Sequence, residues 1–415
     1  MVAEKMAPAS RASATFERGL VALLVALLPI RALSPVFDSI VSVGVLLATP
    51  FLFVPVSRIV KTRTAVAIIG GYLAIFATSP LLWLLTGGRD VDWQQAGYAM
   101  LTMVVSLIHL VVLLWARGSL ELSTIASLYA LGLSLQTLLT LDTTAGNPWK
   151  FGLALPMSVL ALTLSRRASV VWPTVALTSA MAVSILNDYR SFTAIALAAL
   201  IIWLANRAVA GRPWLKLFAT AALTVMLYVL GTQAALAGWL GERNQRVSQM
   251  QVANAGSLIA GGRVESAATI ALFWEKPLGM GPGVLPTAAD IAVGKTALMG
   301  RGVNIDGDLV NDYLFGYGIK LHSVAADLWI NYGLAGLALA LVILGILFQG
   351  LVAAFRDQAT PAFVFLLVIA ALWDMAFSPI GTNLWTVIFT AALVTKIPAV
   401  SSSGDSLRAG KYINA

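Results

Sequence analysis

The sequence of 415 residues contains no cysteine and only two histidines. Disulfide bonds, thiol catalysis and cysteine-ligated metal centres are therefore excluded. Charge is also scarce, because Asp, Glu, Lys and Arg make up 11% of the chain, against roughly a quarter in soluble domains. Hydrophobic residues, by contrast, make up 59%. One water-soluble core cannot hide that much apolar surface, so we expect the excess to face lipid.

Long apolar runs divide the chain into segments that could cross a bilayer. A helix needs roughly 20 apolar residues to span a hydrocarbon core of about 30 Å. About 12 segments meet or approach this length, at residues 19–33, 36–57, 64–86, 94–116, 119–141, 150–165, 169–186, 191–206, 214–239, 324–355, 360–379 and 383–398. The sequence therefore predicts an all-α polytopic membrane protein with about 12 transmembrane helices. The first segment is expected to stay in the protein, since no small-residue cleavage site follows it.

The net charge of +8 is not a nucleic-acid signal, because the basic residues form short clusters between apolar runs. If the N-terminus is cytoplasmic, the short outer loops hold only Arg31, Arg89, Lys150 and Arg190, and most other basic residues lie inside. This is the positive-inside distribution. It predicts that both termini are cytoplasmic and that the chain contacts membrane lipids and no nucleic acid. The Ser- and Gly-containing tail, residues 401–415, is expected to be disordered.

A long loop between the ninth and tenth predicted spans breaks the pattern. It divides the chain into residues 1–240 with nine spans, the loop 241–322, residues 323–400 with three spans, and the tail. Loops of this length are usually functional or disordered. Acidic and basic residues are balanced in it, and the apolar run from Val264 to Trp274 has a helical pattern. We therefore expect an ordered, functional loop on the outer side.

The two histidines have different surroundings in the sequence. His109 lies inside the fourth predicted span, where a hydrogen-bonded packing residue is the simpler interpretation. His322 ends the long loop and precedes the tenth span, at the boundary between water and membrane. A neutral imidazole is the ordinary general base at neutral pH. His322 is therefore the candidate catalytic base.

Two arginines are expected on the outer side at points where a span or an apolar helix begins. Arg190 opens the eighth span and Arg263 precedes the apolar run of the loop. Guanidinium groups suit a diphosphate, because they donate planar, paired hydrogen bonds and do not deprotonate. The alternative for each is an ordinary salt bridge, with Asp188 or Glu265 as the partner.

Two groups of carboxylates complete the candidates. Asp374 interrupts an apolar run near the outer end of the eleventh span, and intramembrane carboxylates are costly enough to suggest function. It is a second candidate catalytic residue, with simple pairing to a cation as the alternative. Asp306-Gly307-Asp308 has the form of a metal-binding Asp-x-Asp, but a surface turn explains it better. We therefore expect neither a metal nor another cofactor.

Two segments late in the chain carry a family resemblance. They are Gly262-Arg263 followed by an apolar helix and by Pro277-Leu278-Gly279-Met280-Gly281-Pro282-Gly283, and His322-Ser323 followed by Gly333-Leu334-Ala335-Gly336. Together with Arg190-Ser191 before a span, they resemble the signature region of the bacterial O-antigen ligase and O-antigen polymerase superfamily. Ser323 stands where that family usually has Asn.

The resemblance implies a GT-C-like fold in a bacterial inner membrane with a periplasmic active site. It implies transfer of a glycan from undecaprenyl diphosphate to a hydroxyl of lipid A–core in the ligases, or to another lipid-linked glycan in the polymerases. His322 would be the general base of an inverting, metal-independent transfer. Arg190 and Arg263 would bind the diphosphate.

The residues themselves leave other classes open. We favour a ligase over a polymerase because of the span count and the compact loop, which is an argument by analogy. A lipid-linked-sugar flippase or transporter is the rival from a different class, although transporters usually show repeats and polar residues at the middle of the membrane. A lipid-binding membrane protein without enzymatic activity is a further alternative.

Overall fold

The computed structural model describes residues 8–31, 41–52, 62–141, 146–164, 170–208, 213–239, 241–316 and 318–395. Within these residues every regular element is a helix, apart from one isolated bridge between Val91 and Val284. The prediction of an all-α protein is thereby confirmed. The tail expected to be disordered lies outside the described residues.

Most predicted apolar segments are helices with nearby ends. Those before the long loop are α1 (Pro8–Leu27), α2 (Val43–Ala48), α4 (Arg63–Leu85), α5 (Trp93–Ser119), α6 (Leu122–Leu139), α7 (Ala154–Leu164), α8 (Val171–Leu186), α9 (Arg190–Ala208) and α10 (Pro213–Leu236). After the loop follow α15 (Val324–Arg356), α16 (Ala362–Phe377) and α17 (Ile380–Val394). The second predicted segment contains only α2 and the 3-10 turn Thr49–Phe51, and its residues 36–40 and 53–57 lie outside the described part.

Five of the described helices, α4, α5, α6, α9 and α15, are long and apolar enough to cross a membrane. The shorter helices α8, α16 and α17 are also apolar, as is the stretch Trp149–Leu164. Their length and composition indicate a membrane-embedded protein. The number of transmembrane helices, about 12, stays a prediction.

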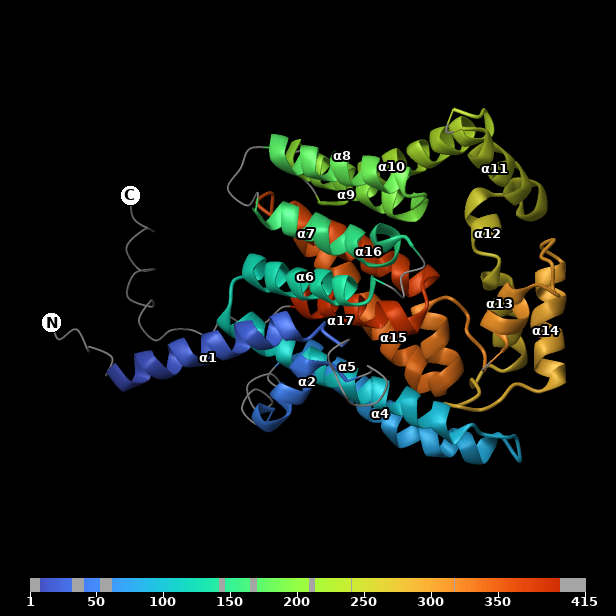
Figure 1. Ribbon diagram of the computed structural model, residues 1–415, viewed down its shortest axis with the longest axis horizontal. Coiled ribbons are helices and arrows are strands. Elements are labelled where there is room, and N and C mark those ends of the chain that lie inside the picture. Colours follow the sequence, from blue (N-terminus) through green and yellow to red (C-terminus); the bar gives the residue numbers. More distant parts are fainter. Residues whose placement is uncertain are drawn as a thin grey trace.

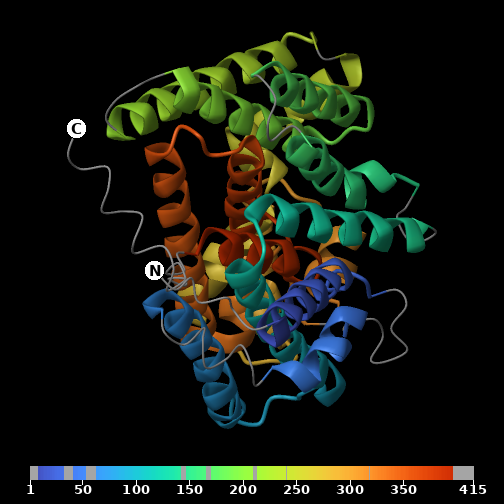
Figure 2. The same ribbon diagram turned by 90° about the vertical axis from the view of Figure 1, so that its left-hand side faces the viewer.

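The C-terminal helices lie in the middle of the bundle. Figure 2 shows α16 and α17 in red among the N-terminal helices, which are blue to green. Most of the side chains of both helices are buried. The helices of the long loop gather at the end of the molecule opposite the start of α1 (Figure 1).

The long loop, residues 241–322, is ordered and has an apolar core of its own. It forms α11 (Glu242–Ala255), α12 (Leu258–Gly262), α13 (Glu265–Glu275), α14 (Ala288–Met299) and a π-helical turn (Leu309–Leu314). The helix α13 matches the apolar run predicted to be helical. Side chains of α13, α14 and the π-helical turn pack with Trp329 and Ile330 of α15 in a cluster separate from that of the bundle.

Residues Pro277–Gly283, which we call the glycine strap, fix the long loop to the bundle. Met280 N donates to Ile330 O of α15 at 2.8 Å, and Asp92 N donates to Gly283 O at the same distance. At Gly283, where φ is +72°, a Cβ atom would lie 2.4 Å from Asp92 O. Only glycine fits this backbone position and close approach. The glycines of the motif therefore have a structural function here.

The helix α15 is broken at Gly333, where φ is 61° and ψ is −146°. A Cβ atom at this position would lie 2.5 Å from Leu278 O of the glycine strap. The break thus coincides with the contact between strap and helix. Residues 324–332 before it carry the apolar side chains that join the core of the long loop.

A buried ion pair ties α14 to the α4–α5 connection. Arg89 donates to both carboxylate oxygens of Asp290, at 2.6 and 3.2 Å. Burial alone would raise the pKa of Asp290, but hydrogen bonds from Arg89 and Thr287 outweigh it and hold the pKa at about 2. Lys276 adds a longer contact, 3.6 Å from Nζ to Oδ1. Asp290 therefore remains charged at any physiological pH.

Candidate active site

His322 ends the long loop in a backbone conformation that few residues other than glycine adopt. Its φ is 55°, in the left-handed region where Asn, Asp and His are the commonest non-glycine residues. The next residue, Ser323, caps α15, since its hydroxyl accepts a hydrogen bond from Ala326 N at 3.2 Å. The turn fixes the direction in which the imidazole leaves the chain.

Asp327, in the first turn of α15, holds this turn in place. Its carboxylate accepts hydrogen bonds from Leu321 N at 2.7 Å and from Ile380 N, at the start of α17, at 3.0 Å. The residue is 2% exposed, and these two backbone donors satisfy its buried oxygens. The Ser323 hydroxyl adds a third tie by donating to Met375 O of α16 at 2.8 Å. The position of His322 is thus fixed relative to α16 and α17.

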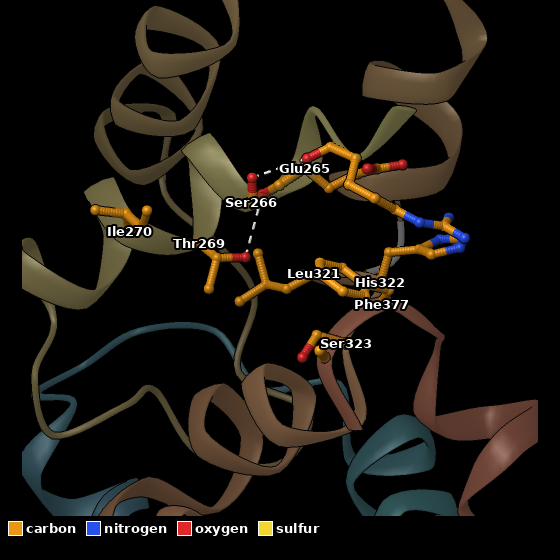
Figure 3. A pocket seen from close by; sticks show the side chains of 10 residues that line it. Glu265, Ser266, Thr269, Ile270, Leu321, His322, Ser323 and Phe377 are labelled. Carbon is orange, nitrogen blue, oxygen red and sulfur yellow. Dashed lines mark hydrogen bonds between the residues drawn. The ribbon is translucent and has the colours of Figure 1, made fainter. Parts of the chain in front are cut away.

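A cavity of about 110 Å³ opens beside this turn. It lies between the N-terminal half of α13, the residues preceding α15 and the end of α16 (Figure 3). Its lining consists of Arg263, Glu265, Ser266, Thr269, Ile270, Leu321, His322, Ser323, Ala376 and Phe377. The fold therefore brings together two predicted site residues, Arg263 and His322, that are separated in sequence by α13 and α14.

The cavity carries charges of both signs. Arg263 stacks over the ring of Trp373 in α16, with Cζ 5.6 Å from the ring centroid. Burial lowers the pKa of His322 below its ordinary value of 6.5; Glu265 opposes this shift and Arg263 adds to it. His322 is therefore neutral at pH 7, the form in which an imidazole accepts a proton.

Two buried polar atoms at the cavity have no hydrogen-bond partner among the described residues. They are Nδ1 of His322 and Oε2 of Glu265. Glu265 is only 7% exposed. Buried polar atoms are nearly always paired, with protein, water or a ligand. The cavity therefore presents both a carboxylate and an imidazole that lack their normal partners.

Tyr189, in the turn before α9, lies close to two of the predicted site residues. The helix α9 packs along α16. Tyr189 lies within electrostatic range of both Asp374 and Arg263, and burial raises its pKa to about 12, with Asp374 adding to the shift and Arg263 opposing it. Asp374, the second candidate catalytic residue, is itself within range of Arg263. These three side chains therefore gather near the end of α16.

Arg190 is paired with a neighbour in the chain and does not line the cavity. Its Nε is 3.5 Å from Oδ1 of Asp188, and the two side chains are 44% and 51% exposed. In this structure Arg190 makes the salt bridge with Asp188 that was the alternative to diphosphate binding. Arg263, by contrast, lines the cavity.

The remaining candidates lie away from the cavity. Asp306 and Asp308 are exposed in a turn, where Asp306 N donates to Asn304 Oδ1 at 3.1 Å. Among the described residues no group of three or more His, Asp and Glu side chains could hold a metal ion. His109 is buried in α5 with its ring 5.0 Å from that of Trp385 in α17, so it packs within the bundle. Neither ring nitrogen has a hydrogen-bond partner among the described residues, so the expected hydrogen bond is not found there.

The sequence did not predict that Glu265 and Asp327 belong to the site. Glu265 was considered only as a salt-bridge partner of Arg263, because an acid in the first turn of a helix is common and carries no signal of its own. Asp327 has one signal in the sequence, a carboxylate near the start of an otherwise apolar span.

Comparison of the chain with models of protein families, with curated proteins and with solved structures found no match.

Proposed function

We propose that this chain is a glycosyltransferase of the O-antigen ligase type, acting at the periplasmic face of a bacterial inner membrane. The observation that supports it is the cavity shared by Arg263 and His322. A fixed cation beside a neutral imidazole suits a reaction in which a hydroxyl loses a proton while a diphosphate leaves. The distribution of basic residues supports the outer-face assignment, and α11 to α14 lie opposite the start of α1.

In the proposed reaction, His322 accepts the proton of an acceptor hydroxyl. The hydroxyl oxygen attacks the anomeric carbon of the donor glycan with inversion, and the bond from that carbon to the diphosphate oxygen breaks. The electron pair leaves with undecaprenyl diphosphate. Arg263 stabilises the negative charge that develops on the leaving group, with Arg190 assisting from the edge of the site. Asp374 lies within range of Arg263 and would hold its guanidinium in position.

The donor and acceptor classes follow from the family resemblance. The donor is an undecaprenyl-diphosphate-linked glycan, and the favoured acceptor is lipid A–core, which makes the protein a ligase of lipopolysaccharide biosynthesis. A polymerase of the same superfamily would use a second lipid-linked glycan as acceptor. The guanidinium of Arg263, assisted by that of Arg190, would supply the positive charge that other glycosyltransferases obtain from a metal ion.

The decisive experiment uses the purified protein in detergent or liposomes with a lipid-linked glycan donor. Lipid A–core and a second lipid-linked glycan are offered as acceptors in separate reactions, and products are separated by mass. Glycan attached to lipid A–core is the expected result. Elongated lipid-linked glycan would identify a polymerase. A flippase would form no glycosidic bond with either acceptor but would move the donor across the liposome membrane.

A further inference from the structure

The strongest observation not used by the proposed mechanism is the pair of unpartnered atoms at the cavity. Nδ1 of His322 and Oε2 of Glu265 are both buried. The two residues line the same cavity and interact electrostatically. An imidazole nitrogen that carries a proton needs an acceptor, and a carboxylate oxygen needs a donor. Each of these two atoms can supply what the other lacks.

The two nitrogens of His322 are not equivalent. Of the two, only Nδ1 is buried without a partner. The proposed mechanism therefore assigns Nε2 to the substrate hydroxyl. A general base that uses Nε2 must carry its own proton on Nδ1, and that tautomer is selected by an acceptor at Nδ1.

We propose that Glu265 is the positioning residue of His322, and that its Oε2 accepts a hydrogen bond from Nδ1–H when the cavity is occupied. This inference rests on the proposed function, in which His322 is the base. Catalytic hydrogen bonds are often long in the free enzyme and shorten when the substrate binds. Both atoms are unpaired in the structure, so this hydrogen bond requires the two side chains to move closer together.

The other charged groups around His322 do not fit this position. Both oxygens of Asp327 already accept hydrogen bonds from backbone N–H groups. Arg263 is a donor only. Tyr313 packs against the imidazole with ring centroids 5.5 Å apart, and burial raises the pKa of its phenol to about 12, so it stays neutral. Lys320 is a cation and lies over the ring of Tyr313, with Nζ 5.8 Å from the ring centroid.

The proton count in the step is simple. One proton moves from the acceptor hydroxyl to Nε2 of His322, and the imidazole becomes an imidazolium. Glu265 remains a carboxylate throughout and stabilises that imidazolium. After the transfer, Nε2 returns its proton to water. Glu265 thus takes no proton and touches neither sugar, and it acts only through His322.

The first test is spectroscopic and does not depend on activity. The chain has only two histidines, so histidine labelled with ¹⁵N gives two sets of ring signals, assigned with a His109→Gln variant. In the wild type with the lipid-linked glycan donor bound, we expect neutral His322 to carry its proton on Nδ1. Because the negative charge of Glu265 favours the imidazolium, Glu265→Gln should lower the pKa of His322 by about one unit. Glu265→Asp should restore most of this shift.

The second test measures glycan transfer with the same variants. Glu265→Gln should reduce the transfer rate by roughly 10²-fold, within the 10²–10⁴-fold that a general base supplies. Glu265→Asp should recover part of the rate. Asp308→Asn removes an exposed carboxylate of the same loop and is the matched control, expected to behave like the wild type in both tests.

The outcomes separate the inference from the proposed function. An unchanged His322 pKa and tautomer in Glu265→Gln would overturn the positioning role even if the wild type transfers glycan. A shifted pKa in a protein that forms no glycosidic bond would retain the pairing and refute the glycosyltransferase. If Glu265→Gln does not fold, the tautomer of the wild type decides the question, because a proton on Nε2 of neutral His322 would overturn the positioning role.

Discussion

The helix bundle and the long loop are stabilised in different ways. The bundle has one large cluster of buried apolar side chains that extends from α1 to α17. The long loop has a smaller cluster and depends in addition on specific polar contacts, such as the pair between Arg89 and Asp290. Its glycine strap fits only because certain positions lack a side chain. The bundle also has helix contacts that need glycine, such as Gly132 against Ala26 O. The difference therefore lies in the amount of buried apolar surface, which leaves the loop more dependent on its ion pair.

The candidate site lies where these two regions meet. Arg263 and Glu265 come from the loop, whereas Trp373 and Phe377 come from α16 of the bundle. His322 stands at the junction and is tied to both. The chemistry is therefore expected to be sensitive to changes in the loop and tolerant of apolar exchanges in the bundle.

The largest expected effect is the loss of glycan transfer when His322, at the end of the loop, is replaced, compared with the replacement of His109 in the bundle. His322→Asn should reduce glycan transfer by roughly 10²–10⁴-fold while binding of the lipid-linked donor survives, because Asn tolerates the left-handed backbone but cannot act as the base. The matched variant His109→Gln, in the bundle, should keep transfer near the wild-type rate. Both are measured by product formation and donor binding on the same purified protein. Transfer by His322→Asn at the wild-type rate would remove this residue from the mechanism.

The second effect contrasts the arginine of the cavity with the arginine at the bundle edge. Arg263→Lys keeps the charge but loses the planar fork and the stacking on Trp373, so transfer should fall by about 10²-fold. Arg190→Lys should cost less, because Arg190 is half exposed and lies outside the cavity lining. Initial rates at saturating donor compare the two. Equal losses would show that Arg190 moves into the site when the donor binds.

The third effect tests the ionic tie of the loop. The pKa of Asp290 is about 2, below the ordinary 3.8, so its contribution to stability is complete above about pH 4 and is lost as the pH falls toward 2. Asp290→Asn should destabilise the docked loop by about 2 kcal/mol at pH 7, and the difference from the wild type should disappear near pH 2. Hydrogen exchange of α14 amides reports it, with Asp306→Asn as the exposed control. A pH-independent difference would contradict the ionic explanation.

The smallest expected effect is that of metal removal. Because Arg263 supplies the positive charge in the proposed mechanism, transfer should be unchanged in EDTA. The paired substitution Asp306→Ala and Asp308→Ala should likewise keep most of the rate. Activity that disappears in EDTA and returns only with Mg²⁺ or Mn²⁺ would assign the exposed turn a role in catalysis.

The sequence predicted the bundle well because its signals are local. The ends of α4 and α5 were predicted within a few residues, since each apolar run has polar neighbours, and Asp92 caps α5 by accepting from Gln94 N and Gln95 N. The start of α1 was placed too late. Its first turns, from Pro8 onward, are not apolar, although Ala, Arg and Glu in them favour a helix.

The candidate site was predicted only in part, because much of it depends on contacts between distant segments. The sequence places Arg263 before the apolar run of the loop and His322 at the end of the loop, and one cavity is lined by both. Their roles in catalysis stay predictions. The break at Gly333 was missed, since it arises from the approach of Leu278 O. The relation of Glu265 to His322 likewise depends on how α13 docks, which no local pattern encodes.

The break in α15 has a consequence for the depth at which the chemistry would occur. A straight helix from Val324 to Arg356 would be about 50 Å long, whereas α16, which returns from the same end, is about 24 Å long. Yet Ser323 and Met375 meet in a hydrogen bond near the far ends of both helices. The bend at Gly333 resolves this mismatch by folding the first turns of α15 back toward the bundle. His322 consequently lies level with the end of α16. Under the proposed function, this is the level at which the diphosphate of a membrane-anchored donor would meet the base.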